Sequence, residues 1–455
     1  MASLAPVTAN PAPADLRSGL ADFRRGAGGE LFEKCRSFRV FTDELRRHGF
    51  FQAQYRVTLE GPLDHTIRVR DPFTGRVRRM LCFDSNSYLG LHLHPRVVDA
   101  VQKVLRRTGY GTPSAQVLGG TNRWLRELEE TISAFHGRED TIVFPTGYAA
   151  NIGALTGLLG PEDLVARDRF SHASLHDGCR WSGARFGGTY AHLDLEDLDR
   201  LLARDAPRAA GRLVVTDGVF SMHGRLAPLP GLVEVARRHR ARLMVDEAHS
   251  LGVIGPTGRG LEEHFDCPGS IDVLMGTFSK SPGSLGGYVT GGADLVEYLR
   301  FFARPSMFTA SLPAPICAGV TEAFRVMASE PEHRERLWAN ARRLHGRLHA
   351  GGLAVPPLES PILPVFLGDE KLLWAASREL FARGLKCGSV SFPAVPRGES
   401  ILRLTVNARH HAAELDRAAD LLVSLGRRFD ILGRSREEIR EIGRRLELGE
   451  ARASA

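Results

Sequence analysis

Short apolar runs alternate with amphipathic stretches between residues 81 and 300. Helix-like segments such as 226–239 separate the runs. Strands that alternate with helical segments predict an α/β domain with a mostly parallel sheet. Ligands of such sheets bind beyond the carboxyl ends of the strands. The runs end in glycine, acidic or hydroxyl residues and are TIVFPTG (141–147), LVVTDGVF (213–220), RLMVDEAHS (242–250) and DVLMGTFS (272–279).

The residues before this region carry other patterns. Residues 55–77 alternate in the manner of strands around the turn DPFTG (71–75), which predicts a β-hairpin. Residues 16–50 have helical patterning with mixed charge. Residues 1–15 are rich in Ala and Pro, so we expect them to be disordered.

The residues after Pro313 form a smaller unit. A helical stretch over about 315–350 leads to strand-like runs at 360–368 and 401–407. We expect a charged helix and a frayed tail over 434–455, with its charge on a solvated face. The predicted division is an N-terminal extension with helix and hairpin (1–80), a large domain (81–325), a small C-terminal domain (326–433) and a charged tail (434–455).

Two short segments carry the strongest chemical signal. LMVDEAHSLG (243–252) is typical of a buried strand that ends in Asp246, with His249 close behind, and MGTFSKSPGSLGGY (275–288) places Lys280 between small hydroxyl residues. A pyridoxal phosphate (PLP) enzyme needs a lysine amine for a Schiff base and a carboxylate that keeps the pyridine nitrogen protonated. Small hydroxyls and backbone amides can hold the phosphate. Together the segments predict a PLP site.

The letters DEAH within 245–250 also mark a family of nucleic-acid helicases. Such a helicase needs a phosphate loop of the form GxxxxGK[ST], and this string does not occur in the sequence. We therefore expect no nucleic-acid partner.

Composition adds little to this picture. The 455 residues are 43% hydrophobic and 25% charged, which is ordinary for a globular protein, and the net charge is +7. This excess of positive charge has two alternative explanations. One is Arg-rich codon usage, and the other is attraction to an anionic substrate or an acidic carrier protein. The six cysteines form no CxxC pair and none lies near metal-spaced histidines, so we expect a reduced, cytoplasmic protein without a metal site. No secretory signal and no apolar stretch of membrane-spanning length occurs.

Nine motifs follow one another between Phe83 and Asp416. They are FDSNSYLGL (83–91), GGTNRWLRELE (119–129), FPTGYAAN (144–151), FSHASLHDG (170–178), TDGVFSMHG (216–224), VDEAHSLGVIGPTGRG (245–260), GTFSKSPGSLGGYVTGG (276–292), FTASLP (308–313) and ILRLTVNARH (401–410). In this order they resemble the α-oxoamine synthases, PLP enzymes of the fold-type I aminotransferase class. The TFSKS context is most similar to that of serine palmitoyltransferases.

The resemblance implies a fold and a reaction. The fold is α/β, with a large, mostly parallel-sheet domain that binds PLP and a smaller C-terminal α+β domain. The reaction joins a small L-amino acid to an acyl thioester, carried by coenzyme A or an acyl-carrier protein, and releases carbon dioxide and a 2-amino ketone. Aminotransferase or other PLP chemistry on the same fold is the alternative, and a non-catalytic partner subunit is a remote one because Lys280 is present.

The resemblance also implies roles for particular residues. Lys280 is expected to hold PLP as a Schiff base, Asp246 to pair with the pyridine nitrogen, and His172 to stack on the ring. Asn86 and Arg403 are expected near the substrate, with Arg403 on its carboxylate. The remaining expected cofactor contacts are Gly147, Tyr148, Ser221, His249, Thr277, Ser279 and Thr309. Thr309 would come from the neighbouring subunit, so the resemblance implies a homodimer with shared sites.

Three positions depart from the family pattern. Ala115-Gln116 stands where many members have Ser-Arg, Leu125 stands in place of a His, and His223 changes the common SMDG or SMEG to SMHG. These departures suggest a branch with its own acyl substrate.

Overall fold

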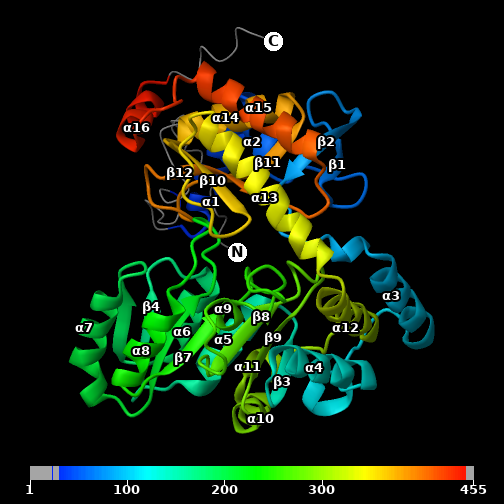
Figure 1. Cartoon of the computed structure of the whole chain (residues 1–455), viewed down its shortest axis with the longest axis vertical. Coiled ribbons are helices and arrows are strands. Elements are labelled where there is room, and N and C mark those ends of the chain that lie inside the picture. Colours follow the sequence, from blue (N-terminus) through cyan, green and yellow to red (C-terminus); the bar gives the residue numbers. More distant parts are fainter. Residues whose placement is uncertain (1–22, 24–29, 447–455) are drawn as a thin grey trace, which may run out of the picture.

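The computed structural model describes residue 23 and residues 30–446. Within this part of the chain two sheets form separate layers, the smaller drawn above the larger in Figure 1. The predicted disorder of residues 1–15 and the end of the predicted charged tail lie outside the described residues. No helix among the described residues is long and apolar enough to span a membrane.

The larger sheet has the strand order β3-β9-β8-β7-β6-β4-β5. Only β9 runs antiparallel to its neighbours among these strands, so the sheet is mostly parallel, as the alternation of strands and helices predicts. The strands are β3 (Asp140–Phe144), β4 (Leu164–Asp168), β5 (Phe186–Tyr190), β6 (Arg212–Asp217), β7 (Arg242–Asp246), β8 (Val273–Thr277) and β9 (Gly287–Gly291).

Both faces of this sheet are buried. Successive residues of one strand point to opposite faces, so Val245 packs in one apolar cluster while Met244 packs in another. Helices cover each face, which is why the strands are continuous apolar runs and not alternating ones. The flanking helices of this part are α4 (Arg123–His136), α5 (Gly147–Leu158), α6 (Ala173–Ser182), α7 (Leu195–Asp205), α8 (Leu229–Arg238), α9 (Leu261–His264), α10 (Ala293–Phe302) and α11 (Arg304–Met307).

The predicted helix over about 315–350 is two helices. Helix α12 (Ala314–Ser329) packs against α3 (Pro95–Thr108) and α4, and α13 (Glu332–Ala350) continues towards the smaller sheet. Pro331 separates them because it lacks an N–H donor and forces the preceding residue out of helical geometry.

The smaller sheet has the strand order β1-β2-β11-β12-β10. The hairpin predicted around 71–75 is present, and its second strand lies parallel to β11, where Leu81 pairs with Leu385. In Figure 1 the blue hairpin accordingly lies beside the orange C-terminal strands. These strands are β1 (Thr66–Arg70), β2 (Val77–Phe83), β10 (Ile362–Gly368), β11 (Leu385–Val390) and β12 (Ser400–Thr405).

Helices from both ends of the chain pack around the smaller sheet. Helix α2 from the N-terminal side contacts α14 from the C-terminal side, so residues of the N-terminal extension belong to the same layer as the C-terminal unit. The domain limits stay a prediction, and β2 runs across position 80. The helices are α1 (Glu33–Arg47), α2 (Phe50–Gln54), α14 (Glu370–Ala382), α15 (Ala412–Arg428) and α16 (Arg436–Arg445).

Candidate active site

Three neighbouring parallel strands end at the candidate site. Strand β6 ends in Asp217, β7 ends in Asp246, and Lys280 follows β8 by three residues. Asp217 and Asp246 are register partners, so their Cα atoms lie side by side. The carboxyl edge of the sheet therefore brings together the two buried acids and the lysine, as the sequence predicts.

The carboxylate of Asp246 is fixed by two donors. The side chain is only 4% exposed, and its Oδ2 accepts a hydrogen bond of 2.7 Å from Asn151 Nδ2. Its Oδ1 accepts the backbone N–H of Ala248 at 2.9 Å. An ionised carboxylate that accepts two hydrogen bonds is held in one orientation and stays suited to pair with a cation.

The second buried acid, Asp217, is more readily protonated than an ordinary aspartic acid. Burial raises the pKa of Asp217 well above its ordinary value, and the neighbouring charge of Asp246 adds to this effect. Asp217 Oδ2 accepts the backbone N–H of His172 at 2.9 Å. The two acids are therefore not equivalent, and Asp217 holds the chain entering α6.

His172 is oriented through its Nδ1 atom. Nδ1 lies 2.7 Å from Ser174 Oγ, and the same hydroxyl accepts a hydrogen bond of 2.8 Å from Asn151 Nδ2. Asn151 therefore connects His172 and Asp246 through one amide group. His172 is an exposed residue, and its ring forms a T-shaped pair with that of Tyr148 at a centroid distance of 6.1 Å.

The amine of Lys280 has a lowered pKa. Burial, with a smaller contribution from Arg403, brings this pKa from 10.5 to about 8, although Asp246 and Asp217 act in the opposite direction. A lysine with such a pKa carries a substantial fraction of the neutral, nucleophilic amine near pH 7 to 8. Lys280 can therefore both react with a carbonyl group and accept a proton.

His249 is a buried, neutral ring that interacts with the charge of Lys280. Burial lowers its pKa well below the ordinary value, and the positive charge of Lys280 acts in the same direction. Its Nδ1 lies 2.6 Å from the hydroxyl of Tyr88, a fully buried residue of the 83–91 motif. This contact fixes the ring, which leaves Nε2 as the atom for a further partner.

The N-terminus of α5 forms a backbone cradle. Thr146 is the N-cap, and its Oγ1 accepts the N–H of Ala149, so the helix amides of Gly147 and Tyr148 precede the first internally bonded donors. A Cβ atom on Gly147 would lie 2.8 Å from Thr277 Oγ1, so only glycine allows this close approach. Ser279 Oγ lies 2.9 Å from Thr277 Oγ1. Amides at a helix N-terminus beside two hydroxyls suit a phosphate group.

Arg403 joins the smaller sheet to this site. It lies on β12, is 7% exposed, and its Nη1 donates to Asn86 Oδ1 at 3.1 Å. Its Nε donates to the carbonyl oxygen of Ser221 at 2.5 Å. A further hydrogen bond joins Arg403 to the Tyr88 hydroxyl. These three partners leave some of the five guanidinium N–H donors for an acidic group.

Thr309 and the three positions that depart from the family pattern make none of the contacts described above. Thr309 is exposed in the segment between α11 and α12, and none of the contacts described above includes it. Gln116 donates through Nε2 to the Val143 carbonyl at 2.7 Å. Leu125 is 1% exposed in the apolar core, so it fills space inside the fold. His223 stacks on Phe170 with a centroid distance of 5.0 Å.

Sequence reasoning missed three residues of the site. Asn151, Ser174 and Tyr88 hold Asp246, His172 and His249 in place. All three stand within the quoted motifs, and Asn151 comes one helical turn after Gly147, which places it over the same cradle. That spacing was the available signal.

Known proteins share this architecture. Residues 78–422 match the Aminotransferase class I and II family. The chain is 39% identical over 428 residues to 4-hydroxy-2,2'-bipyrrole-5-methanol synthase PigH of Serratia sp.. This match covers 93% of this chain but only 65% of PigH. It is 38% identical over 404 residues to serine palmitoyltransferase of Sphingobacterium spiritivorum, covering 89% of this chain and 98% of that protein.

A solved structure agrees with these matches. A high-resolution structure of SPT with a PLP internal aldimine superposes with a TM-score of 0.84 at 34% identity, and the match covers 89% of this chain and all of that one. The fold-type I architecture expected from the sequence is therefore confirmed. On the family match, the relatives and this superposition, the chain belongs to the α-oxoamine synthases of the aminotransferase class I and II family.

Proposed function

We propose that this protein joins a small L-amino acid to an acyl thioester and releases carbon dioxide and a 2-amino ketone, with PLP as its cofactor. The observation that carries the proposal is the position of Lys280 beside the buried acids Asp246 and Asp217 at the carboxyl ends of β6 to β8. PLP supplies an electron sink for bond breaking at the amino-acid Cα when it is bound there.

The residues present fit PLP. Lys280 would hold the aldehyde carbon, and the fixed carboxylate of Asp246 would pair with the pyridine nitrogen. The amides of Gly147 and Tyr148, with the hydroxyls of Thr277 and Ser279, would hold the phosphate. The exposed ring of His172 is available to stack on the cofactor.

Two further residues would surround the pyridine ring. His249 Nε2 and the Ser221 hydroxyl are available for the phenolic oxygen, since His249 Nδ1 is occupied by Tyr88 and Ser221 uses its carbonyl to hold Arg403.

The same residues would also handle the substrate. Arg403 would bind the amino-acid carboxylate with the N–H groups that Ser221, Asn86 and Tyr88 leave free. The Lys280 Nζ atom, with its pKa of about 8, would take the Cα proton near neutral pH. His172 would hold the amino acid in one orientation through its fixed ring, which favours one bond for cleavage.

We propose that the protein acts as a homodimer in which Thr309 completes the partner's site. Apolar side chains gather on two neighbouring segments, which a bridge between Ala115 and Ala310 joins. Leu118 is 80% exposed and Phe308 is 69% exposed. Large exposed apolar patches are typical of surfaces that another chain covers.

We propose that an acidic carrier protein can deliver the acyl group, as an alternative to coenzyme A. Basic side chains at the end of α3 and the start of α4 make no ion pair within the described residues. They are Lys103, Arg106, Arg107 and Arg123. Exposed cations without a carboxylate partner attract an anionic surface. A cytoplasmic location is also proposed, because all six cysteines are free thiols.

A product screen tests the reaction. Purified protein is incubated with single amino acids and acyl thioesters, and mass spectrometry identifies 2-amino ketones while released carbon dioxide is measured. The Lys280→Ala variant should give no product and no visible cofactor band. Amino-group transfer without carbon dioxide release would mean that the reaction is an aminotransferase reaction and the proposal is wrong.

A comparison of donors tests the carrier. One acyl group is supplied on coenzyme A and on a carrier protein at two salt concentrations. We expect Arg106→Ala combined with Arg107→Ala to raise the KM for the carrier-bound donor at low salt. The matched pair Arg444→Ala and Arg445→Ala at the end of α16 should have no such effect. A carrier-bound donor that is inert at low salt would refute this part.

A further inference from the structure

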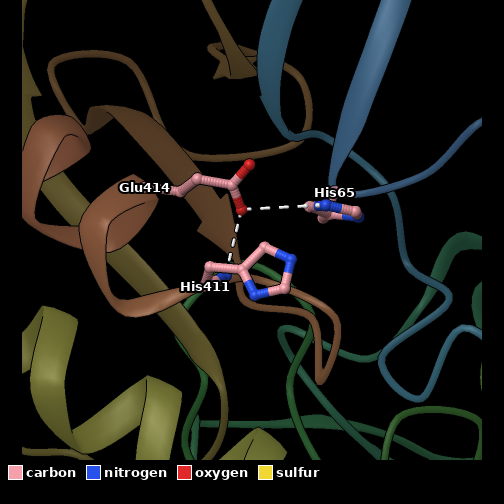
Figure 2. A group of neighbouring side chains, drawn as sticks. All are labelled: His65, His411 and Glu414. Atoms are coloured by element: carbon pink, nitrogen blue, oxygen red, sulfur yellow. Dashed lines mark hydrogen bonds and ion pairs between the residues drawn. The ribbon is translucent and has the colours of Figure 1, made fainter.

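A separate group of metal-ligating side chains lies in the smaller unit. His65 directly precedes β1, His411 is the N-cap of α15, and Glu414 lies in its first turn. One ligand atom from each residue lies within 4.8 Å of the other two. Figure 2 shows the Glu414 carboxylate turned towards His65, with the His411 ring beside it. We propose that these three side chains bind a divalent transition-metal ion of the zinc class.

The donor set selects the class of ion. Two imidazoles and one carboxylate are a common zinc ligand set, with a water molecule in the fourth position. Calcium and magnesium prefer oxygen ligands, so the two histidines disfavour them. The sequence predicted no metal site because cysteine spacing gave no signal, and His65 lies far along the chain from the other two ligands.

The spacing of the ligands is close to what the ion needs. A tetrahedral site with bonds of about 2.0 to 2.1 Å has ligand-to-ligand distances of roughly 3.4 Å. The Nε2 of His65 lies 3.7 Å from Oε2 of Glu414. That carboxylate oxygen also accepts the N–H of His411 at 3.0 Å, which orients Glu414. The exposed His411 ring can rotate towards the ion.

A second carboxylate supports His65 from behind. Nδ1 of His65 lies 3.0 Å from Oδ1 of Asp64, and Arg409 Nε lies 3.0 Å from both Asp64 oxygens. This position of the Asp64 carboxylate beside the far nitrogen of His65 would favour the tautomer that presents Nε2 to a metal.

Two other sets of side chains are less suited to bind a metal ion. His410 packs near His65, but its Nδ1 accepts the Asn407 N–H at 3.0 Å and its Nε2 lies 3.1 Å from the Cys82 carbonyl. A second group, His94, Glu330 and His333, has similar composition. There Arg96 Nη1 lies 2.7 Å from Glu330 Oε1, so a guanidinium already neutralises the carboxylate.

The bound ion would join distant parts of the chain. His65 belongs to the N-terminal hairpin and the other ligands belong to α15. Arg409, which holds Asp64, follows β12, the strand that carries Arg403. Metal binding would therefore stabilise the packing of the hairpin against the C-terminal helix.

The test uses the untagged full chain loaded with PLP, freed of excess PLP and treated with a chelator. Zinc is then titrated by calorimetry and its effect on the melting temperature is measured. We expect one ion per chain and a rise in Tm of roughly 3 °C at a zinc concentration about 100-fold above the Kd. With cobalt in place of zinc, a visible absorption band typical of tetrahedral coordination is expected.

Matched variants assign the ligands. His411→Asn keeps a side chain suited to the N-cap, and Glu414→Gln keeps an acceptor for the His411 N–H, so both should fold. Each should weaken zinc binding at least tenfold. His94→Asn changes the N-cap histidine of α3 in the alternative group and should leave zinc affinity unchanged. Absence of zinc binding, unchanged affinity in either α15 variant, or a loss in His94→Asn would overturn the proposal.

Discussion

The reactivity of Lys280 should depend on pH, and the lowered pKa of the buried amine should determine the pH range in which the reactivity changes. Burial and, to a smaller extent, the charge of Arg403 lower the pKa of this amine to about 8, against the opposing effect of Asp246 and Asp217. The neutral amine is the form that attacks an aldehyde. At pH 7 about 10% of an amine of pKa 8 is neutral, against about 0.03% for an ordinary lysine, which is roughly a 300-fold difference.

The rate at which PLP-free protein takes up PLP measures this difference. Since the pKa is lowered, the second-order rate constant should rise about tenfold per pH unit below pH 7 and level off above about pH 8. A stopped-flow spectrometer follows the visible band. Lys280→Ala serves as the control, because only four other lysines can react, namely Lys34, Lys103, Lys371 and Lys386.

One result would refute the reasoning. If the rate keeps rising up to about pH 10, the amine has an ordinary pKa and burial does not activate it. Arg403→Met supplies an internal check, because removing this positive charge should move the bend to higher pH.

Three further changes test other contacts. Asp246→Asn leaves the N–H of Asn151 or of Ala248 without its acceptor, so the free energy of unfolding should fall by about 1–3 kcal/mol. Turnover should fall by several orders of magnitude, and a loss below about tenfold would refute the pairing of Asp246 with the pyridine nitrogen. Arg403→Lys should raise the amino-acid KM about 10- to 100-fold but leave the KM of the acyl thioester unchanged, and equal effects would make Arg403 structural. Burial raises the pKa of Glu247 to about 7, above its unfolded value near 4.5, so chemical denaturation should show stability lost as pH rises from 5 to 8. The variant Glu247→Gln should lack this loss of up to about 3 kcal/mol, and an identical pH profile would contradict the assignment.

The local sequence was sufficient to predict the large sheet and the ends of its strands. The apolar runs that end at Asp217 and Asp246 became buried parallel strands, because a strand covered on both faces needs a continuous apolar run. The same logic placed Lys280 beside the two acids. The resemblance supplied Arg403, whose position on β12 follows from no local pattern.

Contacts across the chain were beyond local sequence. The sequence associates Leu125 with a change of acyl substrate, but the Leu125 side chain packs in the core. The hydrogen bond of Tyr88 to His249 joins residues from distant segments, so no periodicity indicates it. The break at Pro331 was visible in the sequence, since proline ends helices, and it divides the predicted helical stretch into α12 and α13.

The parallel pairing of β2 with β11 bears on how the protein is made. Leu81 leaves the ribosome about 300 residues before its partner Leu385. The smaller sheet cannot close before β11 is made, so the hairpin keeps an open strand edge until then. Such edges promote pairing with other chains. We therefore expect that the newly made protein depends on chaperones at this stage, and that C-terminal truncations leave the hairpin prone to aggregation.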